Sequence, residues 1–145
     1  MLFSIGADHR GFSAKTELIK WLNSQHIEFN DFGATSEQPD DDYNDYAKLV
    51  AEAVLISPAP DHFGVLICGS GQGMAMQANR YPGVRAAVCY SPSVAAKARG
   101  HNSANIICIP ADDHPDVPAI VQAFISATPL TDEKHQRRNQ KLDEI

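Results

Sequence analysis

The chain has 145 residues, of which 43% are hydrophobic and 21% charged, so we expect one globular domain spanning 1–145 and neither a disordered nor a fibrous protein. The net charge of −6 argues against nucleic acid or an anionic membrane as a partner. No apolar run approaches the length that spans a bilayer, and the N-terminus shows no pattern of a secretory signal, so we expect a cytoplasmic protein.

The first half of the chain alternates between strand and helix patterns. Residues 2–7 predict a strand, and residues 14–22 carry apolar side chains at helical spacing. Residues 27–33 alternate like a second strand, and residues 34–42 form a polar, acidic loop. Residues 43–56 again show helical spacing and end before a proline-rich turn.

The second half continues the alternation. Three strands are expected, each followed by a helix, and the last apolar helix is followed by a highly charged one with a capping-box-like start at Thr131. The strands are 65–68, 85–89 and 105–109, and the helices are 74–78, 91–99, 118–127 and about 131–145. This order predicts a Rossmann-like three-layer α/β/α sandwich with a five-stranded parallel sheet. The charged last helix has few apolar residues to bury, so we expect it to pack on a partner subunit.

The segment Cys68-Gly69-Ser70-Gly71-Gln72-Gly73 sits at a strand-to-helix turn. In open α/β sheets such turns face a crevice, and the N–H groups of a glycine-rich loop can bind an anion there. A thiol beside these groups can act as a general base while the amides stabilise an oxyanion. Proton abstraction next to a carbonyl needs this pair of features.

Other polar residues follow or precede the predicted strands. Asp8 and His9 follow the first strand, so they share the carboxyl edge of the sheet with Cys68. His101 and Asn102 precede the last strand and belong at the opposite edge, so His101 either folds back or serves a neighbouring subunit. His101 can move a proton on or off a sugar hydroxyl, and Asp8 can orient hydroxyls.

Each of these residues also has a purely structural interpretation. Buried cysteine is common in cores, and an aspartate after a strand often caps a helix. A histidine can cap the end of a helix, an aromatic residue can be half-buried at a helix start, and basic residues usually lie on a solvated face. These interpretations apply to Cys68, Asp8, His9, His101, Tyr43, Lys134 and Arg138.

Several cofactor motifs are absent from the sequence. The glycines read G-x-G-x-G after the third strand, without the spacing or the acidic residue of a dinucleotide fold, and no phosphate-loop motif occurs. The six histidines show no compact metal-ligand spacing. The cysteines Cys68, Cys89 and Cys108 are widely spaced, which indicates reduced core thiols and disfavours a thiol redox protein. We expect neither a metal nor a cofactor.

Taken together, these segments resemble the type B ribose-5-phosphate isomerase family, which includes the galactose-6-phosphate isomerase subunits. The resemblance runs in order along nearly the whole chain, through Gly6–Gly11, Gly64–Gly73, Gly83–Ala86, Ala98–Asn102 and His135 with Arg138. It implies metal-free aldose–ketose isomerisation of a phosphorylated sugar through a cis-enediolate, with ribose 5-phosphate as the first candidate. It also implies a homodimer, or a tetramer built from it, with the site at the subunit interface.

The resemblance assigns roles to individual residues. Cys68 is implied as the base that moves a proton between two carbons, His101 opens the sugar ring, and Asp8 and Ser70 lie near hydroxyls. The remaining assignments are substrate contacts: Gly69, Gly71, Gln72 and Gly73 at the enediolate oxygen, His9, Lys134 and Arg138 at the phosphate, and Tyr43 and Asn102 elsewhere on the substrate.

Three positions depart from the family pattern. Lys134 replaces an arginine, Ser103 replaces an aspartate, and Ile109–Asp112 stands where the family commonly has Leu-Gly-x-Arg. That arginine helps to bind phosphate, whereas Asp112 is expected to repel it. A tetrose, pentose or hexose phosphate therefore stays open as substrate. So does a non-catalytic module that binds a sugar phosphate or a nucleotide.

Overall fold

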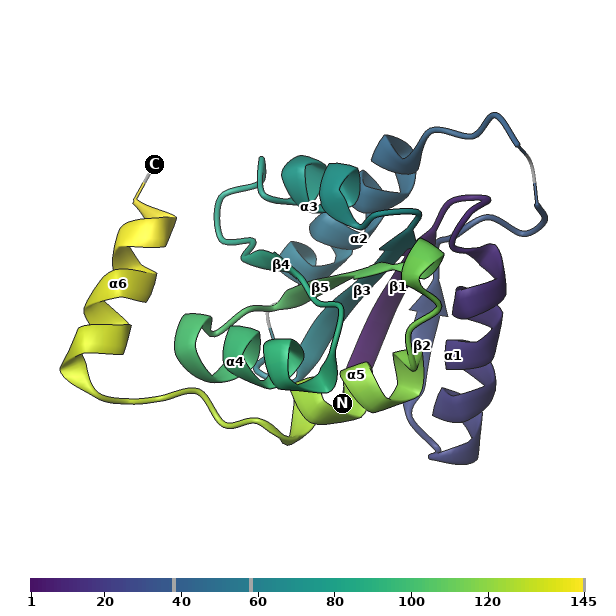
Figure 1. Cartoon of the computed structure of the whole chain (residues 1–145). Coiled ribbons are helices and arrows are strands. Elements are labelled where there is room, and N and C mark those ends of the chain that lie inside the picture. The colour runs from purple at the N-terminus through teal and green to yellow at the C-terminus, as the bar shows by residue number, and fades with distance from the viewer. Residues whose placement is uncertain (38, 58, 145) are drawn as a thin grey trace.

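The computed structural model describes residues 1–37, 39–57 and 59–144, and within them a five-stranded parallel sheet has helices on both faces (Figure 1). The predicted fold class is thereby confirmed. The elements are β1 (Leu2–Ala7), α1 (Phe12–Ser24), β2 (Glu28–Asp31), α2 (Tyr43–Ile56), β3 (His62–Cys68), α3 (Gln72–Ala78), β4 (Ala86–Val88), α4 (Pro92–Asn102), β5 (Ile106–Pro110), the 3-10 turn η1 (Ala111–Asp113), α5 (Val117–Ser126) and α6 (Glu133–Asp143).

The strand order is β2-β1-β3-β5-β4, so the last strand in sequence lies inside the sheet. All seven residues of β3 are buried, which explains the apolar run that ends at Cys68. Ala7 pairs with Ile67, and Cys68 pairs with Pro110. Because the pairing is parallel, β1, β3 and β5 end together, and the three chain segments that follow them emerge at one edge of the sheet.

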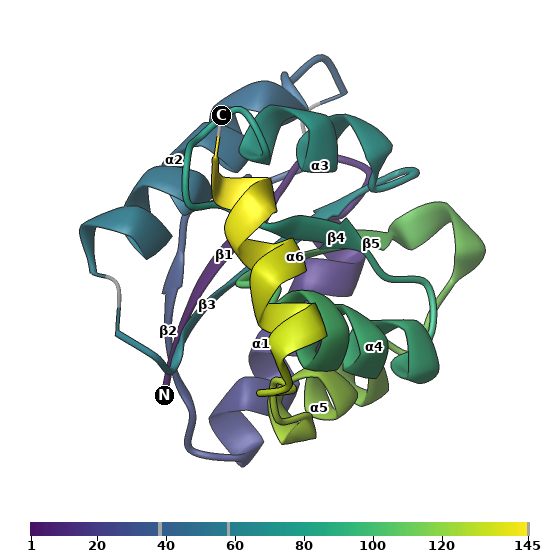
Figure 2. The ribbon, with the colours of Figure 1, turned by 90° about the vertical axis from the view of Figure 1, so that its left-hand side faces the viewer.

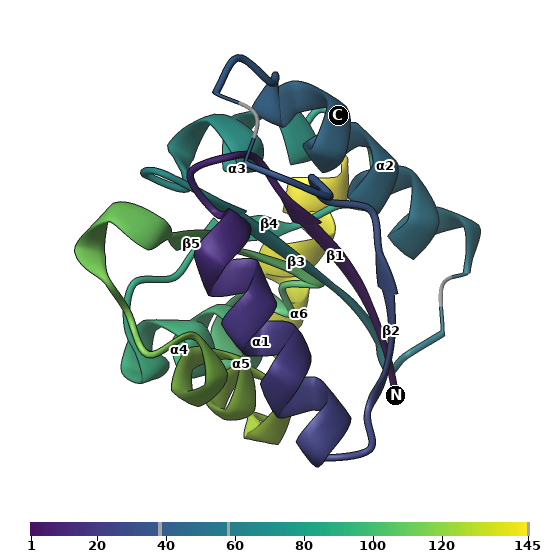
Figure 3. The ribbon, with the colours of Figure 1, turned by 90° about the vertical axis from the view of Figure 1, so that its right-hand side faces the viewer.

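The two faces of the sheet bury different side chains, because successive strand residues alternate. Figure 3 shows α1, α4 and α5 on one side of the strands and α2 and α3 on the other. The first face packs around an edge-on pair, Phe63 and Phe124, with ring centroids 5.4 Å apart. The second face packs Leu66, Met74 and Cys108 beneath α2 and α3. Each such fully buried large side chain contributes about 1.5–3 kcal/mol.

The cysteine prediction also agrees with the structure, since all three cysteines are buried and free. Burial raises the pKa of Cys89 to about 12 and that of Cys108 well above its ordinary value. Neither thiol is therefore ionised at neutral pH, as expected for core residues. In the part of the chain that the structure describes, no helix combines the length and the apolarity needed to span a bilayer.

Helix α6 stands apart from the sandwich, on the side of α4 and β4 (Figures 1 and 2). It buries none of its residues, and polar contacts hold it: the Arg85 guanidinium pairs with Asp143 at 2.7 Å, and Asn139 donates to the His101 carbonyl at 3.2 Å. The predicted start at Thr131 is wrong by one residue. Asp132 caps the helix instead, because its carboxylate reaches the backbone N–H of His135 at 3.3 Å.

Element ends differ from the predicted ones by at most three residues, and one difference bears on the site. Helix α4 starts at Pro92, one residue later than predicted, with Ser91 as its cap, and continues to Asn102 rather than ending at Arg99. His101 and Asn102 therefore lie in its last turn, and Ser103 ends it in a left-handed conformation.

Candidate active site

Cys68 is the last residue of β3, and its side chain is only 5% exposed. The following loop turns back over the sulfur, and the N–H of Gly71 donates to Sγ at 3.2 Å. Gly71 has a φ of 72°, a left-handed conformation that a glycine adopts without strain, and it begins α3. Cys68 and the glycine loop predicted beside it therefore form one compact turn.

Burial raises the pKa of the Cys68 thiol, and the nearby Asp8 carboxylate raises it further. The N–H groups of Gly71, Met74 and Ser70 lower the pKa, as the sequence suggested, but they do not outweigh burial. Without a ligand, the sulfur is a protonated thiol at neutral pH. Stabilisation of the thiolate by the loop is therefore only partial in the resting protein.

Asp8 follows β1 and is 4% exposed. Its Oδ1 accepts a hydrogen bond from the N–H of Gly11 at 3.0 Å, which turns the chain into α1. Burial raises the pKa of this carboxyl, and the Gly11 hydrogen bond opposes that rise. The structural and the chemical interpretation therefore apply together, because one oxygen holds the turn while the carboxyl lies close enough to influence Cys68.

His9 is held by a residue that the sequence analysis did not identify. Its Nδ1 lies 2.6 Å from Oδ1 of Asp41, and its backbone N–H donates to the same oxygen at 3.1 Å. Tyr46 donates its hydroxyl to the other oxygen of Asp41 at 3.0 Å. Asp41 lies in the acidic loop before α2, and nothing in its local sequence distinguishes it from the neighbouring aspartates.

Tyr43 lies at the start of α2, against the glycine loop. A Cβ built on Gly73 would lie 2.5 Å from Cζ of the Tyr43 ring, so only glycine fits beneath the ring. Ser70 is exposed at the tip of the loop, and its Oγ accepts a hydrogen bond from the N–H of Gln72 at 3.3 Å. Gln72 is exposed as well.

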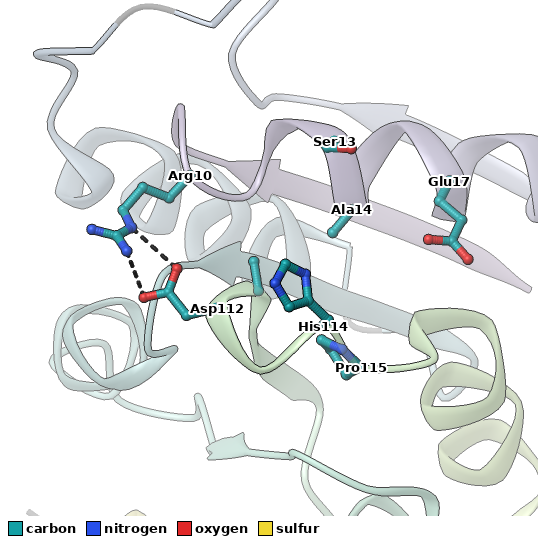
Figure 4. A pocket seen from close by; sticks show the side chains of 8 residues that line it. Arg10, Ser13, Ala14, Glu17, Asp112, His114 and Pro115 are labelled. Carbon is teal, nitrogen blue, oxygen red and sulfur yellow. Dashed lines mark hydrogen bonds and ion pairs between the residues drawn. The ribbon is translucent and has the colours of Figure 1, made fainter.

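Arg10 and Asp112 form a two-pronged ion pair beside the loop, with Nη2–Oδ2 at 2.7 Å and Nε–Oδ1 at 3.2 Å (Figure 4). The pair covers Gly69, whose added Cβ would lie 2.8 Å from Nε of Arg10. The sequence analysis missed Arg10 and expected Asp112 to repel phosphate. In the structure the charge of Asp112 is matched by Arg10, so the expected repulsion is weakened.

Two cavities adjoin this ion pair. One of about 560 Å³ lies between α1 and η1, and the other, of about 330 Å³, lies beside the glycine loop. Asp112 lines both cavities, and Figure 4 shows it with Arg10 in the lining of the first. The first is also lined by Arg10, Ser13, Glu17 and His114, and the second by Gly69, Ser70, Gln72, Tyr90 and Asp113.

The remaining predicted site residues lie elsewhere. Helix α4 starts beyond the carboxyl end of β4 and runs back along the sheet, so His101 and Asn102 reach the opposite edge from Cys68, as expected. The His101 ring lies 5.3 Å from that of His135 on α6. Lys134 and Arg138 are exposed on the same helix. One chain thus gathers Cys68, the glycine loop, Asp8, His9 and Tyr43, but not His101, Asn102, Lys134 or Arg138.

Asp8, His9 and Asp41 have ligand atoms within 4.8 Å of one another, a spacing that could hold a metal ion. Several atoms of this group already have partners, however: Oδ1 of Asp8 accepts from the N–H of Gly11, and Asp41 binds both His9 and Tyr46. The cluster is accounted for as a hydrogen-bonded network.

The chain is similar to known proteins over most of its length. The model of the Ribose/Galactose Isomerase family matches residues 3–142. Ribose-5-phosphate isomerase B of Mycobacterium tuberculosis (strain H37Rv) is 38% identical over 136 residues, which cover 92% of this chain and 83% of that protein. The probable ribose-5-phosphate isomerase B of Mycoplasma pneumoniae is 41% identical over 105 residues, covering 72% of this chain and 68% of the relative.

Solved structures show the same relationship. A ribose 5-phosphate isomerase from Thermotoga maritima superposes with a TM-score of 0.90 at 41% identity, covering 99% of this chain and 98% of the other. Ribose-5-phosphate isomerase B from Mycoplasma genitalium, solved with bound ribulose-5-phosphate, gives 0.91 at 34% identity, with 99% and 94% covered. The family resemblance seen in the motifs is confirmed, and the chain belongs to the ribose/galactose isomerase family.

Proposed function

We propose that this protein interconverts an aldose phosphate and a ketose phosphate, with ribose 5-phosphate and ribulose 5-phosphate as the pair. The names of the relatives and the ribulose-5-phosphate bound in one of them support this choice of sugar. The observation that carries the proposal is the sulfur of Cys68 beneath its glycine loop, with the N–H of Gly71 at 3.2 Å. This turn combines a proton acceptor with donors for a developing oxyanion.

In this mechanism Cys68 first loses its thiol proton to solvent, and the resulting thiolate removes a proton from the carbon next to the carbonyl. The electron pair of that C–H bond moves toward the carbonyl oxygen and gives a cis-enediolate, which the N–H groups of the loop stabilise. The thiol then returns the proton to the neighbouring carbon, while a second proton passes between the two oxygens, near Asp8 and Ser70. Because burial raises the pKa of Cys68, its thiolate is a stronger base than that of an exposed cysteine.

The proposal needs a second copy of the chain. His101, Asn102, Lys134 and Arg138 are implied by the family resemblance, but α4 and α6 hold them away from Cys68. A homodimer in which α6 of one copy packs against the other would complete both sites. His101 would then open the sugar ring with Asn102 beside it, while Lys134 and Arg138 would bind the phosphate. The cytoplasmic location stays a prediction.

Proton NMR in D₂O with aldose and ketose phosphates of four, five and six carbons tests the reaction. We expect the wild-type protein to convert ribose 5-phosphate and to exchange the proton on the carbon next to the carbonyl. Cys68→Ala should slow exchange about 10²–10⁴-fold, the usual contribution of a general base. Cys89→Ala, which removes a buried thiol on the other face of the sheet, is the matched control.

Undiminished exchange in Cys68→Ala would refute the assignment of the base. Resonance shifts without any turnover would favour the second candidate, a module that only binds a sugar phosphate. That candidate is favoured by one observation, the acidic Asp112 that lines both cavities. Turnover of a tetrose or hexose phosphate alone would support the isomerase activity with a different substrate.

A further inference from the structure

The side chain of Asp41 connects the loop before α2 to the residues that follow β1 and to the first turn of α2. It comes from the loop before α2 and reaches His9 beyond the end of β1, 32 residues away. Both carboxylate oxygens are used: Oδ1 binds the ring and the backbone N–H of His9, and Oδ2 binds the hydroxyl of Tyr46. The side chain of Asp41 is only 11% exposed, so water competes little for these bonds.

The charge state of Asp41 determines which nitrogen of His9 carries a proton. Burial tends to raise the pKa of Asp41, but the hydrogen bonds from His9 and Tyr46 outweigh burial and hold the pKa below its ordinary value. An ionised carboxylate can only accept hydrogen bonds, so Nδ1 of His9 must be the donor. Nε2 is then the nitrogen that remains for a ligand.

His9 lies close to the candidate site and is partly accessible to a ligand. His9 directly follows Asp8, which lies at the same edge of the sheet as Cys68, and its side chain is 30% exposed. A histidine whose Nδ1 is held by a carboxylate has a set ring orientation and tautomer, which improves the geometry of a bond from the other nitrogen. A free histidine at this edge would sample several rotamers and lose that advantage.

We propose that Asp41 is a positioning residue, which holds Nδ1–H of His9 so that Nε2 shares with one oxygen of the sugar phosphate the proton that the monoanionic phosphate brings, and that Tyr46 in turn orients Asp41. This rests on the proposed function, because it assigns the sugar phosphate as the ligand of His9. The effect belongs to substrate binding, since Asp41 touches neither the sulfur of Cys68 nor the glycine loop in its hydrogen bonding.

The variants Asp41→Asn, Asp41→Ala and Tyr46→Phe test the proposal, with Asp40→Asn as the matched control. Asp40 is an exposed neighbour in the same loop. Loss of an oriented, charge-assisted bond should raise KM for ribose 5-phosphate about tenfold in Asp41→Ala, with kcat changed less than about threefold. Asp41→Asn keeps an acceptor for Nδ1–H, so its KM should lie between those of Asp41→Ala and wild type. Tyr46→Phe should raise KM about threefold. Asp40→Asn should leave KM unchanged.

Two further measurements do not depend on turnover. Nitrogen-15 NMR of the His9 ring, assigned by its absence in His9→Gln, should show a protonated Nδ1 in the wild type and a mixture of tautomers in Asp41→Ala. The Kd of inorganic phosphate should rise in Asp41→Ala and stay unchanged in Asp40→Asn.

These outcomes separate the two proposals. An inactive wild-type protein would refute the proposed reaction, while the tautomer and the phosphate Kd would still decide the role of Asp41. The positioning role is refuted if KM and the phosphate Kd of Asp41→Ala match wild type, or if kcat falls while KM stays constant. If Asp41→Ala does not fold, the same criteria apply to Asp41→Asn, which keeps the volume of the side chain.

Discussion

The Arg10 guanidinium and the Asp112 carboxylate, 102 residues apart in sequence, meet at 2.7 Å over Gly69, next to the loop that covers Cys68. The pair is exposed, with 57% and 49% of the two side chains accessible. An exposed pair contributes little to stability, so its effect should fall on the ligand rather than on the fold. Arg10 places a positive charge beside the candidate site, and Asp112 offsets that charge.

Asp112→Asn should therefore strengthen binding of a phosphorylated sugar. Removing the carboxylate charge leaves Arg10 free to attract phosphate, and we expect KM to fall about two- to fivefold at low salt, with the effect reduced at high salt. Arg10→Ala should raise KM. Steady-state kinetics at two ionic strengths measures both. Asp113→Asn is the control, and a KM in Asp112→Asn above that of wild type would contradict the expectation.

The raised pKa of Cys68 predicts slow alkylation of the free protein. At neutral pH a thiol whose pKa is raised carries less thiolate than an ordinary cysteine, so iodoacetamide should modify Cys68 slowly, and the rate should increase as pH rises past the ordinary thiol value. Mass spectrometry of timed samples gives the rate and the site. Rapid modification of Cys68 at neutral pH would show that its thiolate is stabilised in the resting protein.

The contact between Gly73 and Tyr43 predicts a non-additive pair of substitutions. Gly73→Ala should destabilise the protein and raise KM, because the new Cβ displaces the Tyr43 ring. In a Tyr43→Ala background the same change should instead stabilise by about 0.5–1 kcal/mol, since alanine favours the helical conformation. Urea unfolding of the four proteins measures the coupling. Equal effects of Gly73→Ala in both backgrounds would mean that the ring does not restrict this position.

Subunit complementation tests whether the site is shared. Cys68→Ala and His101→Ala should each be inactive alone, but a mixture unfolded and refolded together should regain about a quarter of wild-type activity, because half the dimers are mixed and each has one intact site. Sedimentation should show dimers throughout. Refolding each variant separately before mixing is the control. Activity that stays absent after joint refolding would place Cys68 and His101 of one site in the same chain, whereas activity of His101→Ala alone would remove His101 from the reaction.

The sequence by itself determined the elements of this fold. Hydrophobic periodicity is local, so β1, α2 and the buried β3 could be located from spacing alone, and the thiol and glycines after β3 identified a strand-to-helix turn at the carboxyl edge. The position of His101 at the opposite edge followed from the same alternation of strands and helices.

Only the tertiary structure decided which loops meet and which side chains pair. Insertion of β5 between β3 and β4 puts η1 beside the glycine loop, and this brings Asp112 to Arg10. Likewise, one of several similar aspartates reaches His9. Such pairs lie far apart in the chain, and their partners are chosen by strand order and loop path rather than by local propensity. The turn of Cys68 and its glycines could thus be predicted from the sequence, whereas the ion pair of Arg10 with Asp112 and the contact of Asp41 with His9 could not.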